Sequence, residues 1–362
     1  MKKDSSRKEH KMRYPDFLQP NGTIGFLAPA FGCSTQPYLD AFDHSLDKWK
    51  ALGFNTVLGP NCYAGDGVGI STSPKKCGEE VNEMFKKDDV DCLLSCGGGE
   101  LMCEILDHVD FEALRTHEPK WFMGYSDNTN LVHLLVTLCD TAAIYGPCAP
   151  AFGMEPWHAA LQDALDIIMG KKTTVTSYPL WEAESLKDES HPLEPYNVTM
   201  KRILTVYEPD RGLKTVSDPE YSLEAFSGRL LGGCLDCLVN LTGTIFDKTS
   251  DFCEKYKENG IIWFLESCDL NVFSMRRAMW ELEHAGWFKY VKGFLIGRPL
   301  NGEEMFGLDR YQAILHIAKE KNVPVLFDLD IGHRPPTMPL VEGSLATVNV
   351  KGDNVTIRME YK

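Results

Sequence analysis

The sequence predicts an α/β protein built from two domains, on the basis of three observations. The chain has 362 residues, and at roughly 150 residues per domain this length suggests two domains. Short, continuous apolar runs alternate with helical patterns, which is typical of a parallel sheet covered by helices on both faces. A polar stretch with five prolines, at residues 171–228, interrupts this alternation in the middle of the chain.

The first domain is expected at residues 21–170, with a Rossmann-like or flavodoxin-like parallel sheet. Its first apolar run, residues 23–28, leads through a Pro/Gly loop into a helix at about residues 38–52. The same unit then repeats along the chain. Further strands are expected at residues 55–58, 91–95 and 121–125, and a further helix at residues 129–138.

The second domain is expected at residues 229–362, as another α/β unit. Residues 171–228 are interpreted as an inter-domain crossing with an elaborated loop. The glycines of residues 227–233 are expected to open a helix. Strands are expected at residues 261–265, 293–297, 324–328 and within 346–359, and a helix at residues 272–285. Residues 1–20 are expected to be a flexible tail, because their basic residues are followed by no apolar segment of a secretory signal.

Composition excludes several classes of function. With 37 Lys+Arg against 52 Asp+Glu, the formal net charge of −15 would repel a phosphate backbone, so no nucleic-acid partner is expected. No apolar run approaches the ~20 residues of a membrane-spanning helix. Twelve cysteines are too few for a disulfide scaffold of this length, so reduced thiols and a cytoplasmic location are expected.

The pair Cys234-x-x-Cys237 is the one candidate for metal binding. A structural zinc site requires a second Cys or His pair at comparable spacing, and none follows. On a helix the two thiols lie one turn apart, which favours two core residues. We therefore expect neither a metal nor an organic cofactor.

Polar residues just beyond buried strands are the candidates for chemistry, because the carboxyl ends of parallel strands meet at a ligand crevice. Ser126, in Gly124-Tyr125-Ser126-Asp127-Asn128, lies where a strand turns into a helix. This turn is similar to a nucleophile elbow, although Asn128 replaces the last glycine of G-x-S-x-G. The alternative is that Ser126 or Asp127 only caps the helix.

The glycines of Gly97-Gly98-Gly99-Glu100 let backbone N–H groups approach a ligand, as an oxyanion hole requires. A phosphate cradle is disfavoured, because neither G-x-G-x-x-G spacing nor a following Lys-Ser/Thr is present. A tight turn that needs positive φ is the structural alternative.

The second domain supplies a carboxylate and an imidazole. Glu266 ends the predicted strand at 261–265, where it either orients an imidazole or faces a helix dipole. His333 lies in the Gly/Pro loop after the strand at 324–328, whereas most other histidines lie in helical patterns. A serine, a base, a carboxylate to hold the base and a glycine loop are the minimum set for a serine hydrolase.

At these motifs the sequence resembles the LD-carboxypeptidase family of serine peptidases, which includes muramoyltetrapeptide carboxypeptidases and microcin C immunity hydrolases. The resemblance implies an active site at the domain interface, with a catalytic triad of Ser126, His333 and Glu266. It also implies an oxyanion hole from the backbone N–H groups of Gly99 and Asp127, with Gly98 and Glu100 near the substrate. Ser126 Oγ is then expected within hydrogen-bond distance of one His333 nitrogen, and Glu266 on the other.

The resemblance implies a small substrate, either a murein-type peptide or a peptidyl or aminoacyl nucleotide, and a homodimer. Arg298, Arg334 and Arg229 are candidates to bind a substrate carboxylate. The crossing departs from the compact members by its length and its aromatic residues, which stack on a nucleobase or pack the loop onto its domain. These aromatic residues are Tyr178, Trp181, Tyr196, Tyr207, Tyr221 and Phe226. A cysteine hydrolase using Cys96 or Cys268, and a non-catalytic two-domain ligand-binding protein, remain alternatives.

Overall fold

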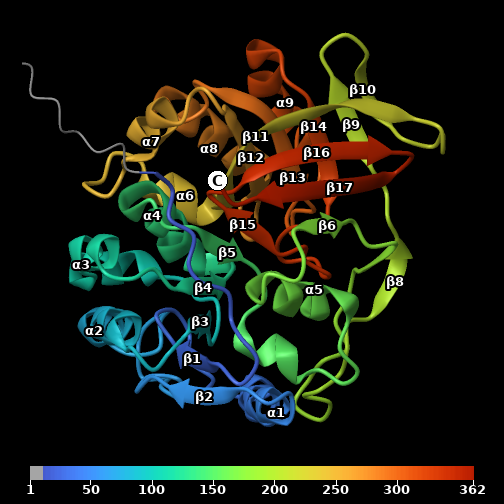
Figure 1. The fold of residues 1–362 in the computed structure, drawn as a ribbon. Coiled ribbons are helices and arrows are strands. Elements are labelled where there is room, and N and C mark those ends of the chain that lie inside the picture. Colours follow the sequence, from blue (N-terminus) through green and yellow to red (C-terminus); the bar gives the residue numbers. More distant parts are fainter. Residues whose placement is uncertain (1–10) are drawn as a thin grey trace, which may run out of the picture.

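The computed structural model describes residues 11–362, which fold around two large β-sheets (Figure 1). The first sheet has six strands in the order β15-β5-β4-β3-β1-β2. Neighbouring strands among β1 to β5 are parallel, and β15 pairs antiparallel with β5. The order 2-1-3-4-5 is the flavodoxin-like order, which confirms the predicted fold class. The strands are β1 Thr23–Leu27, β2 Asn55–Leu58, β3 Cys92–Ser95, β4 Trp121–Gly124, β5 Ala143–Tyr145 and β15 Leu340–Glu342.

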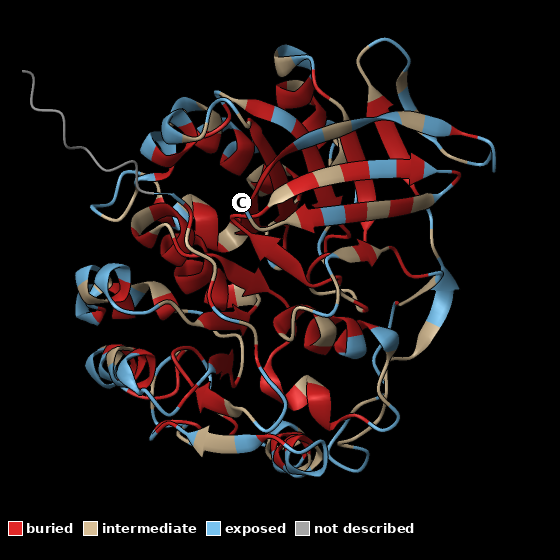
Figure 2. Cartoon of the chain, in the orientation of Figure 1, coloured by how far each residue is buried: buried red, intermediate tan, exposed pale blue. Residues whose placement is uncertain are grey.

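Several α-helices accompany the strands of the first sheet, including the two predicted at residues 38–52 and 129–138. They are α1 Tyr38–Ala51, α2 Pro74–Lys86, α3 Phe111–Thr116, α4 Thr129–Cys139 and α5 Ala159–Ile168, with the 3₁₀ turns η1 Met102–His108, η2 Ser126–Asn128 and η3 Ala149–Gly153. All residues of β3 and β4 are buried, as Figure 2 shows by their red colour. Burial along the whole strand is what a parallel sheet covered on both faces requires.

The second sheet has nine strands in the order β10-β9-β14-β13-β12-β11-β16-β17-β6. Its centre, β11 to β14, is parallel, and antiparallel strands extend it on both sides. The strands are β6 Thr174–Thr176, β9 Thr205–Glu208, β10 Gly212–Thr215, β11 Ser222–Cys234, β12 Ile261–Glu266, β13 Val291–Gly297, β14 Val325–Leu329, β16 Leu345–Lys351 and β17 Asn354–Glu360. The helices are α6 Leu235–Leu241, α7 Thr249–Lys255, α8 Val272–His284 and α9 Arg310–Lys321.

The segment at residues 171–228 is more than a crossing loop. It contributes β6, β9 and β10 to the two sides of the second sheet, and β7 Leu180–Glu182 pairs with β8 Val198–Lys201 in a small separate sheet. In the opposite direction, β15 returns from the C-terminal part of the chain to the first sheet (Figure 1). The two domains are therefore tied together by strands as well as by the crossing.

The expectation that residues 227–233 open a helix is wrong. They form the second half of β11, and the helix α6 starts only at Leu235. The glycines there serve close packing, since a Cβ on Gly232 would lie 1.8 Å from the Phe264 carbonyl oxygen of β12. Gly233, at φ +128°, turns the strand toward α6 in a conformation that favours glycine.

The expected flexible tail does not extend to residue 20. Met12 and Leu18 are buried, and the Arg13 guanidinium donates to the carbonyl oxygens of Leu114 and His117. Residues 1–10 of that expectation lie outside the described residues. Among residues 11–362, no helix has the length and apolar character needed to cross a bilayer.

Candidate active site

Ser126 lies at the sharp turn between β4 and α4. Its backbone has φ +63°, a left-handed conformation that non-glycine residues adopt at a cost and mostly where surrounding structure enforces it. The Ser126 N–H donates to the Tyr145 hydroxyl at 3.2 Å. The turn therefore holds the serine side chain at the carboxyl edge of the first sheet, as a nucleophile elbow does.

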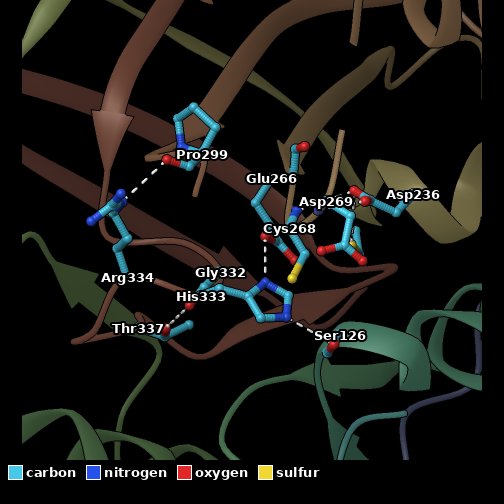
Figure 3. A network of polar contacts seen from close by, with 12 residues as sticks. Ser126, Asp236, Glu266, Cys268, Asp269, Pro299, Gly332, His333, Arg334 and Thr337 are labelled. Atoms are coloured by element: carbon cyan, nitrogen blue, oxygen red, sulfur yellow. Dashed lines mark hydrogen bonds and ion pairs between the residues drawn. The ribbon is translucent and has the colours of Figure 1, made fainter. Parts of the chain in front are cut away.

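His333 reaches Ser126 from the second domain, through the loop that follows β14. Its Nε2 lies 2.8 Å from Ser126 Oγ (Figure 3). The loop can approach because Gly332 has no side chain: a Cβ there would lie 2.4 Å from Glu266 Oε2, and its φ of +96° also favours glycine.

Glu266 ends β12 and is almost completely buried. Its Oε2 lies 2.8 Å from His333 Nδ1, and its Oε1 accepts a hydrogen bond of 2.6 Å from the Tyr145 hydroxyl. The structure thus brings Ser126, His333 and Glu266 into one hydrogen-bonded chain that crosses the domain interface. This order, hydroxyl to imidazole to carboxylate, is the geometry of a catalytic triad.

In the buried pair of Glu266 and His333, the charge on each residue favours the charged form of the other. Burial alone would raise the pKa of Glu266, yet the His333 charge and hydrogen bonds from His333 and Tyr145 hold that pKa below its usual value. Burial likewise opposes the charged form of His333, but the charge and hydrogen bond of Glu266, together with the neighbouring Cys268 thiol, raise the pKa of His333 above its usual value. The imidazole is therefore a stronger base than free histidine.

The glycine loop at residues 97–99 lies against the serine turn. None of the three glycines has a left-handed φ, so the alternative of a turn that needs positive φ is wrong; close approach explains them instead. A Cβ on Gly98 would lie 3.0 Å from Ser126 Oγ, and one on Gly99 would lie 3.0 Å from Asp127 Oδ2. The Glu100 side chain is exposed, and its N–H donates to the Gly69 carbonyl oxygen.

Two carbonyl groups of the loop are held by hydrogen bonds. The Gly97 oxygen accepts from Asn128 Nδ2 at 2.7 Å, and the Gly98 oxygen accepts from the Phe31 N–H at 2.6 Å. Because N–H and C=O point in opposite directions across a trans peptide, the N–H groups of Gly98 and Gly99 face away from these donors. Asn128 thereby links the serine turn to the glycine loop. The feature of the sequence that could have indicated this role is that Asn128 stands where the motif has its last glycine.

Asp127 does not cap α4. Its Oδ2 accepts from the Met102 N–H at 2.8 Å and its Oδ1 from Asn130 Nδ2 at 3.0 Å. Burial raises the pKa of Asp127 to about 6, although these hydrogen bonds oppose the shift. The side chain therefore anchors the segment that follows the glycine loop, and helix capping does not explain this turn.

The guanidinium groups of the candidate carboxylate-binding arginines bond to partners other than the triad residues. Arg298 is buried and ion-paired with Asp330, and Arg334 donates to the carbonyl oxygens of Pro299 and Leu300, turned away from Ser126 (Figure 3). Arg229 donates to Tyr14 and Gly343 in the interior of the fold. Arg298 and Arg334 line one cavity together.

That cavity has a volume of about 230 Å³ and contains Trp181 in its wall, with Arg298, Arg310, Arg334 and Asp328. The guanidinium carbons of Arg298 and Arg334 lie 5.0 and 5.7 Å from the Trp181 ring centroid, within the range of cation–π contacts. The other aromatic side chains of the crossing pack against the core, as the packing interpretation predicts. These are Tyr178, Tyr196, Tyr207, Tyr221 and Phe226.

The cysteines near the site differ in exposure. Cys96 is buried, and burial raises its pKa well above the ordinary thiol value, which disfavours a nucleophilic thiolate. Cys268 is partly exposed and lies beside Glu266 and His333 in Figure 3.

All twelve cysteines are free. Cys234 ends β11 and Cys237 lies on α6, both buried, and residues 11–362 hold no group of three His, Cys, Asp or Glu suited to a metal ion.

Two comparisons place the chain among known proteins. Family models for the N-terminal and C-terminal domains of LD-carboxypeptidases match residues 24–146 and 227–348. The microcin C7 self-immunity protein MccF of Escherichia coli is 25% identical over 352 residues, covering 95% of each chain. A protein of Bacillus subtilis described as a probable murein peptide carboxypeptidase is 24% identical, covering 92% of this chain and 91% of the other.

Solved structures share the fold. MccF in its wild-type apo state matches with a TM-score of 0.76 at 22% identity, over 96% of this chain and 98% of the other. A MccF-like protein from Bacillus anthracis also matches with a TM-score of 0.76, over 96% and 100% of the two chains. Because the two family models together cover most of the chain, the resemblance expected from the sequence is confirmed. The chain belongs to the LD-carboxypeptidase family, and it is a hydrolase of the serine-peptidase type.

Proposed function

We propose that this protein is a serine carboxypeptidase-type amide hydrolase that uses Ser126, His333 and Glu266 as its catalytic triad. The observation that carries the proposal is the hydrogen-bonded chain from Ser126 Oγ through the imidazole to Glu266, with 2.8 Å at each step. A serine hydroxyl is a poor nucleophile at neutral pH until an adjacent imidazole accepts its proton, and this arrangement supplies that base.

In the proposed reaction, His333 Nε2 takes the Ser126 proton while Oγ attacks the carbonyl carbon of an amide. The N–H groups of Gly99 and Asp127, with Gly98 beside them, are proposed to stabilise the oxyanion. The imidazolium then gives its proton to the leaving amine, and a water activated by His333 releases the acyl group from Ser126. Glu266 keeps the imidazole oriented throughout.

We propose that the substrate is a short peptide with a free carboxylate or an aminoacyl or peptidyl nucleotide. The names of the relatives support both classes, and MccF structures contain aspartyl sulfamoyl adenosine or glutamyl sulfamoyl guanosine. Incubation with a murein tetrapeptide and, separately, with an aminoacyl sulfamoyl nucleoside, followed by mass spectrometry, distinguishes the two. Release of terminal D-alanine supports the peptide, release of the amino acid supports the nucleotide, and cleavage of neither contradicts both assignments.

The wall of the Trp181 cavity favours the nucleotide, because an indole flanked by two guanidinium groups suits a planar ring or a phosphate. We expect Trp181→Ala to raise KM for an aminoacyl nucleotide roughly 10-fold or more, as the loss of one stacking contact would. kcat should change little, since the indole is proposed to bind a remote group equally in ground and transition states. Trp280→Ala, at an exposed tryptophan on α8, is the control; equal effects of both variants would contradict this subsite.

The cysteine-hydrolase alternative makes an opposite prediction about Ser126. If Cys268 were the nucleophile, iodoacetamide would abolish activity and Ser126→Ala would retain it.

A non-catalytic binding protein would instead bind a ligand tightly without turnover, and Glu266→Gln would not change that binding. We further propose a cytoplasmic location, which the free cysteines support. We also propose a homodimer, as the family resemblance implies; a single monomeric species in sedimentation velocity at micromolar concentration would contradict the dimer.

A further inference from the structure

Tyr145 joins two members of the proposed triad through one buried hydroxyl. It is the last residue of β5 and has no exposed surface. Its hydroxyl donates to Glu266 Oε1 at 2.6 Å and accepts the Ser126 N–H at 3.2 Å. A buried phenol requires partners for its polar atom, and here both partners belong to the catalytic apparatus.

These contacts close a ring of hydrogen bonds across the domain interface. One side of the ring runs from Ser126 Oγ through His333 to Glu266 Oε2, and the other returns from Glu266 Oε1 through Tyr145 to the Ser126 backbone. Each carboxylate oxygen therefore has its own donor. With both oxygens held, the carboxylate cannot rotate away from the imidazole without breaking the bond to Tyr145.

We propose that Tyr145 is a positioning residue of this hydrolase, which holds the Glu266 carboxylate toward His333 and fixes the peptide that carries Ser126. The inference rests on the proposed function and adds a fourth side chain to it. Burial, together with the Glu266 charge, raises the pKa of Tyr145 well above its ordinary value. The hydroxyl thus keeps its proton and remains a donor throughout the working pH range.

A donor on Glu266 also influences the titration of His333. When His333 is protonated, its positive charge offsets part of the negative charge of the Glu266 carboxylate. When His333 is neutral, the carboxylate keeps its full negative charge. The Tyr145 hydrogen bond is stronger to the fully charged carboxylate, so it favours the state in which His333 is neutral and able to act as a base. Removing the phenol oxygen should therefore move the acid limb of kcat/KM to higher pH.

The test compares Tyr145→Phe with Tyr178→Phe in the full-length enzyme. We expect Tyr145→Phe to lower kcat roughly 10- to 100-fold and to shift the acid limb upward by about one pH unit, as loss of a hydrogen bond to a charged group would. Tyr178 also donates from a buried position to a carboxylate, Asp163 Oδ2 at 2.8 Å, but makes no hydrogen bond to a triad residue. The Tyr178→Phe variant should leave the acid limb of kcat/KM in place, even if it changes the midpoint of thermal unfolding.

A second measurement strengthens the hydrogen bond rather than deleting it. Incorporation of 3-fluorotyrosine at position 145 supplies a more acidic phenol and a stronger donor, so the acid limb should move to lower pH. Opposite shifts in the two variants support the proposal. An unmoved acid limb in both, with Ser126→Ala inactive, overturns the role of Tyr145 alone, whereas an active Ser126→Ala overturns the proposed function itself.

Discussion

Ser126→Ala is expected to lower kcat by roughly 10⁴- to 10⁶-fold, the loss that follows removal of a triad nucleophile. The methyl group leaves His333 Nε2 with no hydroxyl to deprotonate and the substrate carbonyl with no attacking oxygen. Alanine tolerates the φ of +63° about as poorly as serine, so the fold should be unchanged. Product formation followed by mass spectrometry over hours measures the residual rate.

The same variant should still bind substrate, because the glycine loop and the Trp181 cavity are untouched. Calorimetric titration with an uncleaved substrate would then give a Kd comparable to the KM of the natural enzyme. Ser45→Ala is the matched control, since Ser45 is a buried serine on α1 whose hydroxyl donates only to Phe42. A Ser126→Ala enzyme with more than about 1% of the natural rate would contradict the nucleophile assignment.

Glu266→Gln is expected to lower kcat by roughly 10²- to 10⁴-fold, for a reason of proton placement. The glutamine Oε1 can still accept from Tyr145, but its amide must then donate to His333 Nδ1. Nδ1 becomes an acceptor, the proton moves to Nε2, and the imidazole presents an N–H to Ser126 instead of a lone pair. A steady-state kinetic assay at neutral pH measures the loss.

The pH profile gives a second, independent signature of this pair. Since the Glu266 carboxylate raises the pKa of His333, the neutral base accumulates only as pH rises through that raised value, and kcat/KM should climb above the ordinary histidine pKa of about 6.5. Removing the negative charge lowers that pKa, so the residual activity of Glu266→Gln should rise at lower pH than in the natural enzyme.

Glu342→Gln is the control for the pH profile. Glu342 and His133 form another buried pair, 2.9 Å apart, that does not touch the triad. Loss of the Glu342 charge can reduce thermal stability, but it should leave the acid limb of kcat/KM at the same pH. An identical shift in both variants would show that the acid limb reports the fold as a whole rather than the Glu266–His333 pair.

The positions of the strands, and the polar residues that follow them, could be predicted from the sequence. Continuous apolar runs such as the one ending at Leu265 specify buried parallel strands, and the residue after such a run lies at the ligand edge of the sheet. That rule selected Ser126 and Glu266 as candidates, and the family resemblance joined them to His333. Tyr145 lies at the same edge as the last residue of β5, but an aromatic residue at the end of an apolar run did not stand out in the sequence.

Features set by contacts distant in sequence were not predictable from local patterns. The glycines at 232 and 233 resemble a helix start, but Gly232 lies close to Phe264 on the neighbouring strand and Gly233 lies close to Thr129 of α4. The burial of Leu18 depends on a backbone bond to Ile168, and the antiparallel pairing of β15 with β5 joins segments almost 200 residues apart. Hydrophobic periodicity describes one segment at a time and contains no information about such partners.

The late return of β15 has a consequence for biosynthesis. Residues 340–342 provide the neighbour that covers the open edge of β5, so the sheet bearing Ser126 stays unfinished until these residues have left the ribosome. His333 also emerges at that stage. A nascent chain therefore lacks the proposed catalytic base until residue 333 has been synthesised, and a fragment that stops short of that residue should be both inert and prone to associate through its bare strand.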